Sequence, residues 1–196
     1  MKCYLMNNSS EIKELIISWM VISLCFAYNL DLMNFVFRLP IYLITAGIAF
    51  LAHELSHRFV ARRMGYVARY KMWNWGLALA LFSAIISGGR AIFSAPGAVY
   101  ILYGGIYSWR DPKKDETLIT AAGPLANIIL SILFYGLSSG DGITSTVGYV
   151  GFALNSSIAT YNLLPIPPLD GSKIFRGNML LWIALMGASV CIILYA

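Results

Sequence analysis

The two histidines of the chain lie four residues apart, as His53 and His57, and Glu54 directly follows the first of them. In a helix this spacing is a little over one turn, so both imidazoles lie on the same face. Two neutral imidazoles at that spacing suit zinc, and a carboxylate beside them can act as base on a zinc-coordinated water. The pattern therefore predicts metal-assisted hydrolysis, provided that the rest of the chain can build such a site.

The composition is that of a membrane protein. Of the 196 residues, 59% are hydrophobic and 12% are charged, with a mean hydropathy of +0.70, whereas soluble domains carry about 25% charged residues. A soluble fold of this length could not bury so much apolar surface, so we expect one integral-membrane domain over residues 1–196. The expected fold is all-α and polytopic, with about six transmembrane helices, because each apolar stretch approaches the ~20 residues needed to cross a hydrocarbon core. The stretches cover residues 12–30, 40–61, 72–88, 117–137, 147–169 and 178–196.

The basic residues predict how the chain is oriented in the cell membrane. With the N-terminus in the cytosol, every Lys and Arg except Arg38 and Arg90 lies at the cytosolic face, in agreement with the positive-inside rule. The net charge of +5 then reflects contact with anionic lipid headgroups rather than with nucleic acid. No clear cleavage site follows the first apolar stretch, so we expect it to remain as the first helix of a multi-pass protein. The basic segments are residues 58–71, 110–114 and 173–176.

Only two acidic residues, Glu54 and Asp170, are expected at membrane depth. Ionisable groups in a bilayer are costly and usually face a metal, a partner or a cavity. Two histidines and one carboxylate form the three-ligand set of a catalytic zinc site with one open position. His53 precedes the basic residue Arg62 by nine positions, roughly 14 Å along a helix, and Asp170 directly precedes segment 173–176. Both segments can therefore meet near the cytosolic side, from which water and zinc would enter.

Three separated motifs also resemble those of the site-2 protease family of intramembrane zinc metalloproteases. Their order and spacing agree with that family over a catalytic core of about residues 40–174. The resemblance implies regulated intramembrane proteolysis, in which peptide bonds within or near transmembrane segments of membrane proteins are hydrolysed inside the lipid bilayer. The chain looks like a minimal, core-only member, without a PDZ-like insert. The motifs are AHELSHR at 52–58, AAGPLAN at 121–127 and NLLPIPPLDG at 162–171.

The resemblance also assigns roles to residues that match the family's motifs. It implies one zinc ion per chain, held by His53, His57 and Asp170. It implies that Glu54 is the general base. Asn162, upstream of the aspartate, would orient the substrate or stabilise the oxyanion.

The other motif residues have structural interpretations. We expect Gly123 and Pro124 near the start of the fourth helix, where a missing backbone bond is tolerated and small residues allow close approach to the zinc helix. Asn127 would hydrogen-bond across that contact, in a packing role rather than a catalytic one. Asn155 begins a glycosylation pattern, which we discount because it lies inside a membrane span. The proline-rich run 165–168 cannot form a regular helix and should aim Asp170 at the metal.

Segment 90–109 is apolar but is interrupted by Pro and Gly residues, so it is either an irregular seventh crossing or a re-entrant element. Its central part, 91–103, has β-forming residues on both sides of a Pro-Gly pair. One alternative is a kinked membrane helix. The other, suggested by the β-elements of the family, is a β-hairpin that offers its edge to an extended substrate.

Three other interpretations of these residues compete with that of a protease. A metal transporter would need polar groups at several depths, whereas the acidic and imidazole groups here cluster at one depth. A catalytically silent relative would bind membrane proteins without cutting them, although Glu54 and all three expected ligands are present. A purely structural helix contact would leave two imidazoles and a carboxylate to satisfy one another in an apolar environment.

Overall fold

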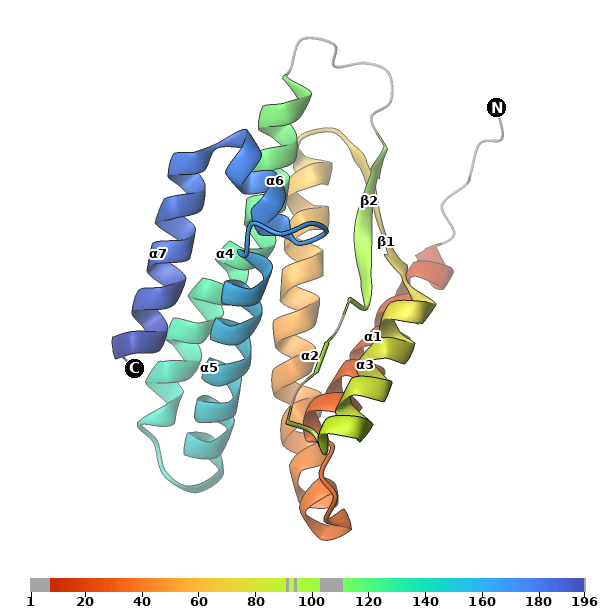
Figure 1. Ribbon diagram of the computed structural model, residues 1–196, viewed down its shortest axis with the longest axis vertical. Coiled ribbons are helices and arrows are strands. Elements are labelled where there is room, and N and C mark those ends of the chain that lie inside the picture. The colour runs from red at the N-terminus through yellow and green to blue at the C-terminus, as the bar shows by residue number, and fades with distance from the viewer. Residues whose placement is uncertain (1–7, 91, 94, 103–110, 196) are drawn as a thin grey trace.

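The computed structural model of the protein describes residues 8–90, 92–93, 95–102 and 111–195. Within these residues the chain is mostly helical, as predicted, with seven helices and a two-stranded sheet. Figure 1 shows α2 at the centre, with α1, α3 and the sheet on one side and α4 to α7 on the other. The elements are α1 (Asn8–Ala27), α2 (Leu32–Arg63), β1 (Val67–Met72), α3 (Asn74–Ser87), β2 (Gly97–Leu102), α4 (Pro112–Ser138), α5 (Gly142–Asn162), α6 (Asp170–Gly177) and α7 (Met179–Tyr195).

Within the described ranges, α2 and α4 are the two helices that are long and apolar enough to cross a membrane, and α3 and α7 are shorter apolar helices. α2 begins after Asp31, whose carboxylate accepts a hydrogen bond from the N–H of Met33 at 2.9 Å. α4 begins after Asp111, which accepts from the N–H of Lys113 at 3.0 Å, and Pro112 is its first residue. Because these polar residues start the helices, both begin before the apolar stretches that predicted them.

Two predictions about helix boundaries are wrong. The fifth predicted stretch, 147–169, extends too far, because α5 ends at Asn162 and the prolines of the following run cannot donate the backbone hydrogen bonds of a helix. After this run the chain starts α6 at Asp170. Gly123 and Pro124 do not lie near the start of α4, since the Asp-Pro start signal begins that helix earlier and leaves both residues in its interior.

The expectation of an all-α fold also needs a correction, because β1 and β2 form an antiparallel sheet. Val67 lies opposite Leu102 and Met72 lies opposite Gly97. The strand predicted after the Pro-Gly pair is therefore present, but its partner is β1, in the segment predicted as a cytosolic loop. A continuous helix over 91–103 is excluded by β2. Residues 91, 94 and 103–110 of the predicted re-entrant segment lie outside the described residues.

Two carboxylates of α1 occupy the outer edge of β1. Glu11 accepts a hydrogen bond from the N–H of Tyr70 at 3.0 Å, and Glu14 accepts one from the N–H of Met72 at 2.9 Å. Buried backbone donors need such partners, and an edge strand without them would be free to pair elsewhere. These contacts satisfy the edge of β1 on the α1 side, and its other edge pairs with β2.

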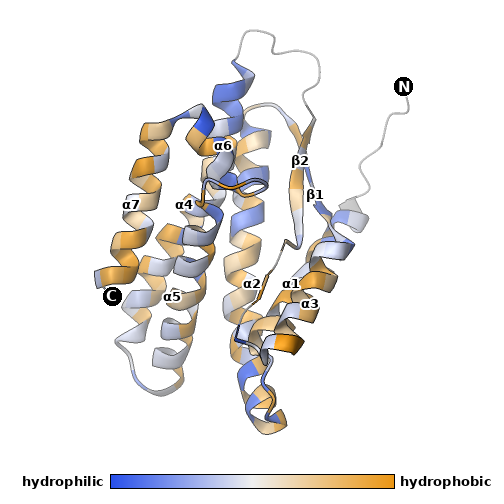
Figure 2. Ribbon diagram, in the orientation of Figure 1, coloured by the Kyte–Doolittle hydropathy of each residue, from blue (hydrophilic) through white to orange (hydrophobic). Residues whose placement is uncertain are grey.

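The packing between helices relies on small residues, while large apolar side chains remain on the outside. A Cβ on Gly151 of α5 would lie 2.3 Å from the ring of Phe134 on α4, so glycine allows these helices to pack closely. Leu180 and Leu194 of α7 are 79% and 73% exposed. Figure 2 shows hydrophobic residues along the outer helices and hydrophilic residues at the start of α4 and around α6. This distribution suits a lipid environment.

Candidate metal centre

Three of the predicted site residues lie together where α2 meets the start of α6. The Nε2 atoms of His53 and His57 are 3.1 Å apart, and each is 3.1 Å from Oδ2 of Asp170. Both imidazoles are buried, and the Asp170 side chain is 18% exposed. The arrangement offers one donor atom per residue to a common point.

The far nitrogens of both imidazoles are held by hydrogen-bond acceptors. Nδ1 of His53 donates to Oδ1 of Asn127 at 2.7 Å, and Nδ1 of His57 donates to the carbonyl oxygen of Ile119 at 2.8 Å. Each neutral imidazole carries one N–H, so a proton on Nδ1 leaves a lone pair on Nε2. Both lone pairs are thereby directed to the point where the Asp170 carboxylate also lies.

The orientation of the Asn127 amide is fixed by its other contacts. Its Nδ2 donates to the carbonyl of Ala49 and to Oδ1 of Asn155, both at 2.9 Å. Nδ2 of Asn155 donates in turn to the carbonyl of Gly151 at 2.8 Å. All of the Asn127 donors are used, so its Oδ1 must face His53.

The donor set fits a zinc ion. Two lone pairs and a carboxylate oxygen that approach to 3.1 Å repel one another, and one divalent cation satisfies all three. Imidazole nitrogen and carboxylate oxygen are donors that zinc prefers, and three protein ligands leave a fourth position open. Hydrogen bonds from the other ring nitrogen to an amide or carbonyl oxygen are also usual for zinc-binding histidines.

Two glycines allow the helices to come this close. A Cβ on Gly123 of α4 would lie 2.4 Å from Nε2 of His57 and 2.8 Å from Nε2 of His53, so any other residue would intrude on the donor atoms. A Cβ on Gly171, directly after Asp170, would lie 2.1 Å from the carbonyl oxygen of Leu163. That same oxygen accepts a hydrogen bond from Nε1 of Trp182 on α7 at 2.7 Å.

Glu54 is buried at 8% exposure and does not join the three-residue cluster. Within the part of the chain that the structure describes, its Oε2 is buried and has no hydrogen-bond partner. A buried carboxylate oxygen without a donor is costly unless a further molecule supplies one. A water or a substrate group could therefore donate a hydrogen bond to Oε2 of Glu54.

The structure does not connect Asn162 with the cluster by a hydrogen bond. This residue ends α5, and its Nδ2 donates to the carbonyl of Ile158 at 3.0 Å. Asn127, in contrast, does more than the expected packing, because it binds a histidine of the cluster. A signal for this role exists in the sequence: Asn127 follows Gly123 by four residues and so lies on the same helix face. For Asn155 the sequence suggests only a glycosylation pattern, whereas the structure places its buried amide against Asn127.

Comparison with known proteins decides the family. The sequence profile of peptidase family M50 matches residues 41–150. The chain belongs to peptidase family M50, the site-2 protease family. It is therefore a zinc metalloprotease of a membrane-embedded family, as the motifs predicted.

Curated relatives that carry "zinc metalloprotease" in their names agree with this assignment. A protein of Methanocaldococcus jannaschii is 36% identical over 179 residues, which cover 89% of this chain and 88% of the relative. YwhC of Bacillus subtilis is 26% identical over 70% of this chain and 68% of its own length. Rip2 of Mycolicibacterium smegmatis is 31% identical over 66% of this chain and 54% of its own length. No solved structure matches the chain.

Proposed function

We propose that this M50 peptidase hydrolyses peptide bonds within or near the transmembrane segments of membrane proteins, as in regulated intramembrane proteolysis. One zinc ion per chain would be held by His53, His57 and Asp170. The observation that supports this proposal best is the mutual distance of 3.1 Å between the three donor atoms, with both Nδ1 atoms bound to acceptors. The whole chain, 1–196, would act as one domain around a catalytic core of 40–174.

The proposed chemistry assigns the proton transfers to Glu54. Zinc, when bound, lowers the pKa of a coordinated water and polarises the carbonyl of the scissile peptide bond. The Glu54 carboxylate, whose Oε2 has no partner among the described residues, accepts the water proton and delivers it to the leaving amine. Asn162 would donate to the developing oxyanion or orient the substrate after releasing the carbonyl of Ile158.

The substrate must be extended at the cut site, because a helix shields its own carbonyl groups. We propose that β2 pairs with this extended segment by strand addition. Glu11 and Glu14 already occupy the outer edge of β1, so β2 offers the remaining edge. Val99 and Ile101 of β2 pack near Ala61 of α2, which keeps this strand beside the zinc helix.

We further propose a multi-pass arrangement in which α1 to α5 and α7 cross the membrane. The N-terminus and the entrance to the site would lie on the cytosolic side. Support comes from the basic residues: Arg62 at the end of α2, Lys113 at the start of α4 and Lys173 in α6 lie toward the same end of the molecule. Asp170 is the first residue of α6, the short helix that lies toward that end (Figure 1).

Zinc content and cleavage, measured on the same purified proteins, test the proposal. Wild type and Glu54→Gln should each hold close to one zinc per chain, whereas His53→Ala and Asp170→Ala should lose most of it. The wild type should cleave a reporter protein with one transmembrane helix, Glu54→Gln should cleave it more slowly by a factor of 10²–10⁴, and the two zinc-deficient variants should not cleave it. Normal cleavage by Glu54→Gln would remove Glu54 from its role, and zinc flux through proteoliposomes would favour a transporter.

A further inference from the structure

The helix that carries the two histidines has a second, opposite face. Ile44 and His53 are nine residues apart, or two and a half turns, so they lie on opposite sides of α2. His53 faces α4 through its contact with Asn127. The opposite face carries Ile44, Leu55 and Phe59, which are 54%, 38% and 59% exposed. This face takes no part in the metal centre.

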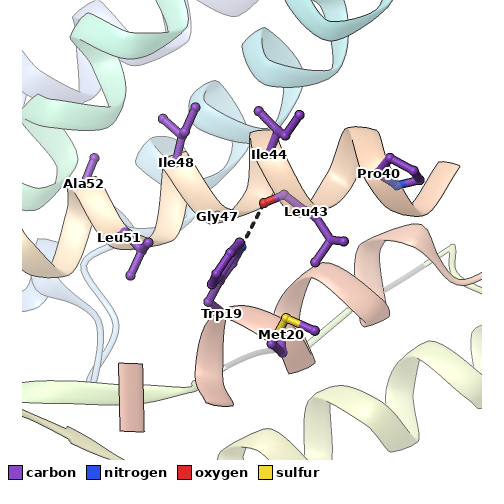
Figure 3. Close-up of a pocket in the computed structure, with 9 residues that line it drawn as sticks. All are labelled: Trp19, Met20, Pro40, Leu43, Ile44, Gly47, Ile48, Leu51 and Ala52. Carbon is purple, nitrogen blue, oxygen red and sulfur yellow. Dashed lines mark hydrogen bonds between the residues drawn. The ribbon is translucent and has the colours of Figure 1, made fainter. Parts of the chain in front are cut away.

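An apolar groove of about 730 Å³ lies on this face, between α1 and α2. Figure 3 shows Trp19 of α1 against α2, where its Nε1 donates to the carbonyl of Leu43 at 2.8 Å. A Cβ on Gly47 would lie 2.2 Å from that nitrogen, so the indole rests directly on the helix backbone. Ile48 and Leu51 line the groove farther along α2.

Farther along α2, three arginines surround a smaller hollow of about 360 Å³ on the same face. Its remaining lining residues are the apolar Leu55 and Phe59. The guanidinium of Arg63 lies over the Phe59 ring, 5.2 Å from its centre. The hollow therefore combines an apolar floor with positive charge. The arginines are Arg58, Arg62 and Arg63.

The positive charge of the hollow is only partly compensated. Glu11 lies 3.0 Å from Arg58 and 3.8 Å from Arg62. In the part of the chain described by the structure, no carboxylate lies within salt-bridge distance of Arg63. Guanidinium groups bind phosphate with paired hydrogen bonds, so an anionic phosphate group suits the hollow.

The distance along α2 from the groove to the arginines fits a lipid. Arg62 lies ten residues beyond Ala52, where the groove ends, a rise of about 15 Å and half of the ~30 Å hydrocarbon core. We propose that this face of α2 binds one anionic phospholipid, with its phosphate at the arginines and its acyl chains along Phe59 and Leu55 toward the groove. The proposal rests on the membrane-embedded family and is independent of the protease site on the opposite face.

Native mass spectrometry of the purified protein tests this site with two lipids that share the same acyl chains, phosphatidylglycerol and phosphatidylcholine. The wild type should retain phosphatidylglycerol in preference to phosphatidylcholine. Arg63→Gln should reduce that preference roughly fivefold, and Arg62→Gln with Arg63→Gln should reduce it further. Arg38→Gln is the matched control, because Arg38 lies over the Tyr42 ring of the same helix, 5.1 Å from its centre, at the other end.

Equal retention of both lipids by the wild type would overturn the proposal. So would a loss of the phosphatidylglycerol preference in Arg38→Gln as large as that in Arg63→Gln. Displacement of the lipid by inorganic phosphate would assign the hollow to a soluble anion. A change from dimer to monomer in Arg63→Gln would assign the face to a second copy of the chain.

The position of the acyl chains is tested separately. Brominated phosphatidylglycerol should quench the tryptophan emission of wild type more than that of Trp19→Phe, and equal quenching would place the chains elsewhere.

Discussion

At the scale of single residues, Asn127 connects the metal centre with the helix behind it. Its Oδ1 accepts from His53, while its Nδ2 is held by Ala49 and Asn155. Because the amide is fully buried and every polar atom has a partner, its orientation cannot change without leaving a buried group unsatisfied. We therefore regard Asn127 as a positioning residue for His53.

This role predicts a change in zinc affinity. Asn127→Leu should weaken zinc binding 10–100-fold, because the loss of the acceptor frees the imidazole to rotate and to change tautomer. Asn127→Asp keeps the acceptor for His53 but places an oxygen against the acceptors on Ala49 and Asn155, so it should retain only part of the affinity. Competition with a chromophoric chelator measures the dissociation constant. Ser131→Ala is the control, since Ser131 is fully buried in the same helix but bonds to Ile128 within it. Unchanged affinity in Asn127→Leu would contradict the assignment.

Gly123 allows a second test at the same scale. A methyl group at this position would lie 2.4 Å from Nε2 of His57, so Gly123→Ala should displace the imidazoles and leave the purified protein with little zinc. Gly136→Ala is a matched control on the same helix, because a Cβ at Gly136 meets nothing within 4 Å. Metal analysis of both variants measures the effect. Equal zinc content in the two would show that α4 can move away without consequence.

At the scale of elements, the contact between α1 and β1 depends on Glu11. This carboxylate is 2% exposed, pairs with Arg58 at 3.0 Å and accepts the N–H of Tyr70. Glu11→Ala leaves a partly buried arginine and a buried backbone donor without their partner, which should cost about 2–3 kcal/mol, below the 3–5 typical of fully buried pairs. Thermal unfolding in detergent measures the loss of stability, and hydrogen exchange of the Tyr70 amide should accelerate.

The control for this prediction is Glu116→Ala. Glu116 lies 3.9 Å from Lys173, and both side chains are exposed, by 44% and 46%. Exposed pairs of this kind contribute about 0–1 kcal/mol, so Glu116→Ala should unfold near the wild-type temperature. If both alanine variants lose the same stability, the special role of Glu11 is wrong.

The elements also show what the sequence can and cannot predict. The apolar stretches identify the helices α1 to α5 and α7, because hydropathy over some twenty residues is a strong signal. The pairing of β1 with β2 is not predictable in the same way, since a strand's partner depends on contacts between remote segments, and here α3 lies between the two strands along the chain. The start of α4 and the end of α5 differ from prediction. The polar residue that starts α4 and the prolines that follow α5 are not part of the apolar pattern.

For the site, the grouping of His53, His57 and Asp170 could be predicted, because their spacing and their place in or beside apolar stretches leave few alternatives. The hydrogen-bond chain from His53 through Asn127 to Asn155 could not, because the meeting of three helices at one depth depends on their packing. The roles of the three grouped residues as zinc ligands stay predictions, and so do those of Glu54 as the base and of Asn162 at the oxyanion.

At the scale of the whole molecule, the metal centre joins α2 to α6, two helices that have few other direct contacts with each other. His53 and His57 belong to the central helix α2, whereas Asp170 begins α6, which is held to the end of α5 through Gly171 and to α7 through Trp182. The cores on the two sides of α2 contain different residues. A zinc ion at this position would connect the central helix with the C-terminal helices.

Zinc should therefore stabilise the folded protein as a whole. A ligand present at 1,000 times its dissociation constant stabilises the state that binds it by about 4 kcal/mol, so removal of zinc by a chelator should clearly lower the unfolding temperature of the wild type. Asp170→Ala should unfold near the temperature of chelator-treated wild type, and further chelator should have little effect on it. Differential scanning calorimetry in detergent measures both. An equal chelator effect on wild type and on Asp170→Ala would mean that the stabilising metal binds elsewhere, because the variant has lost the only ligand that α6 contributes to this centre.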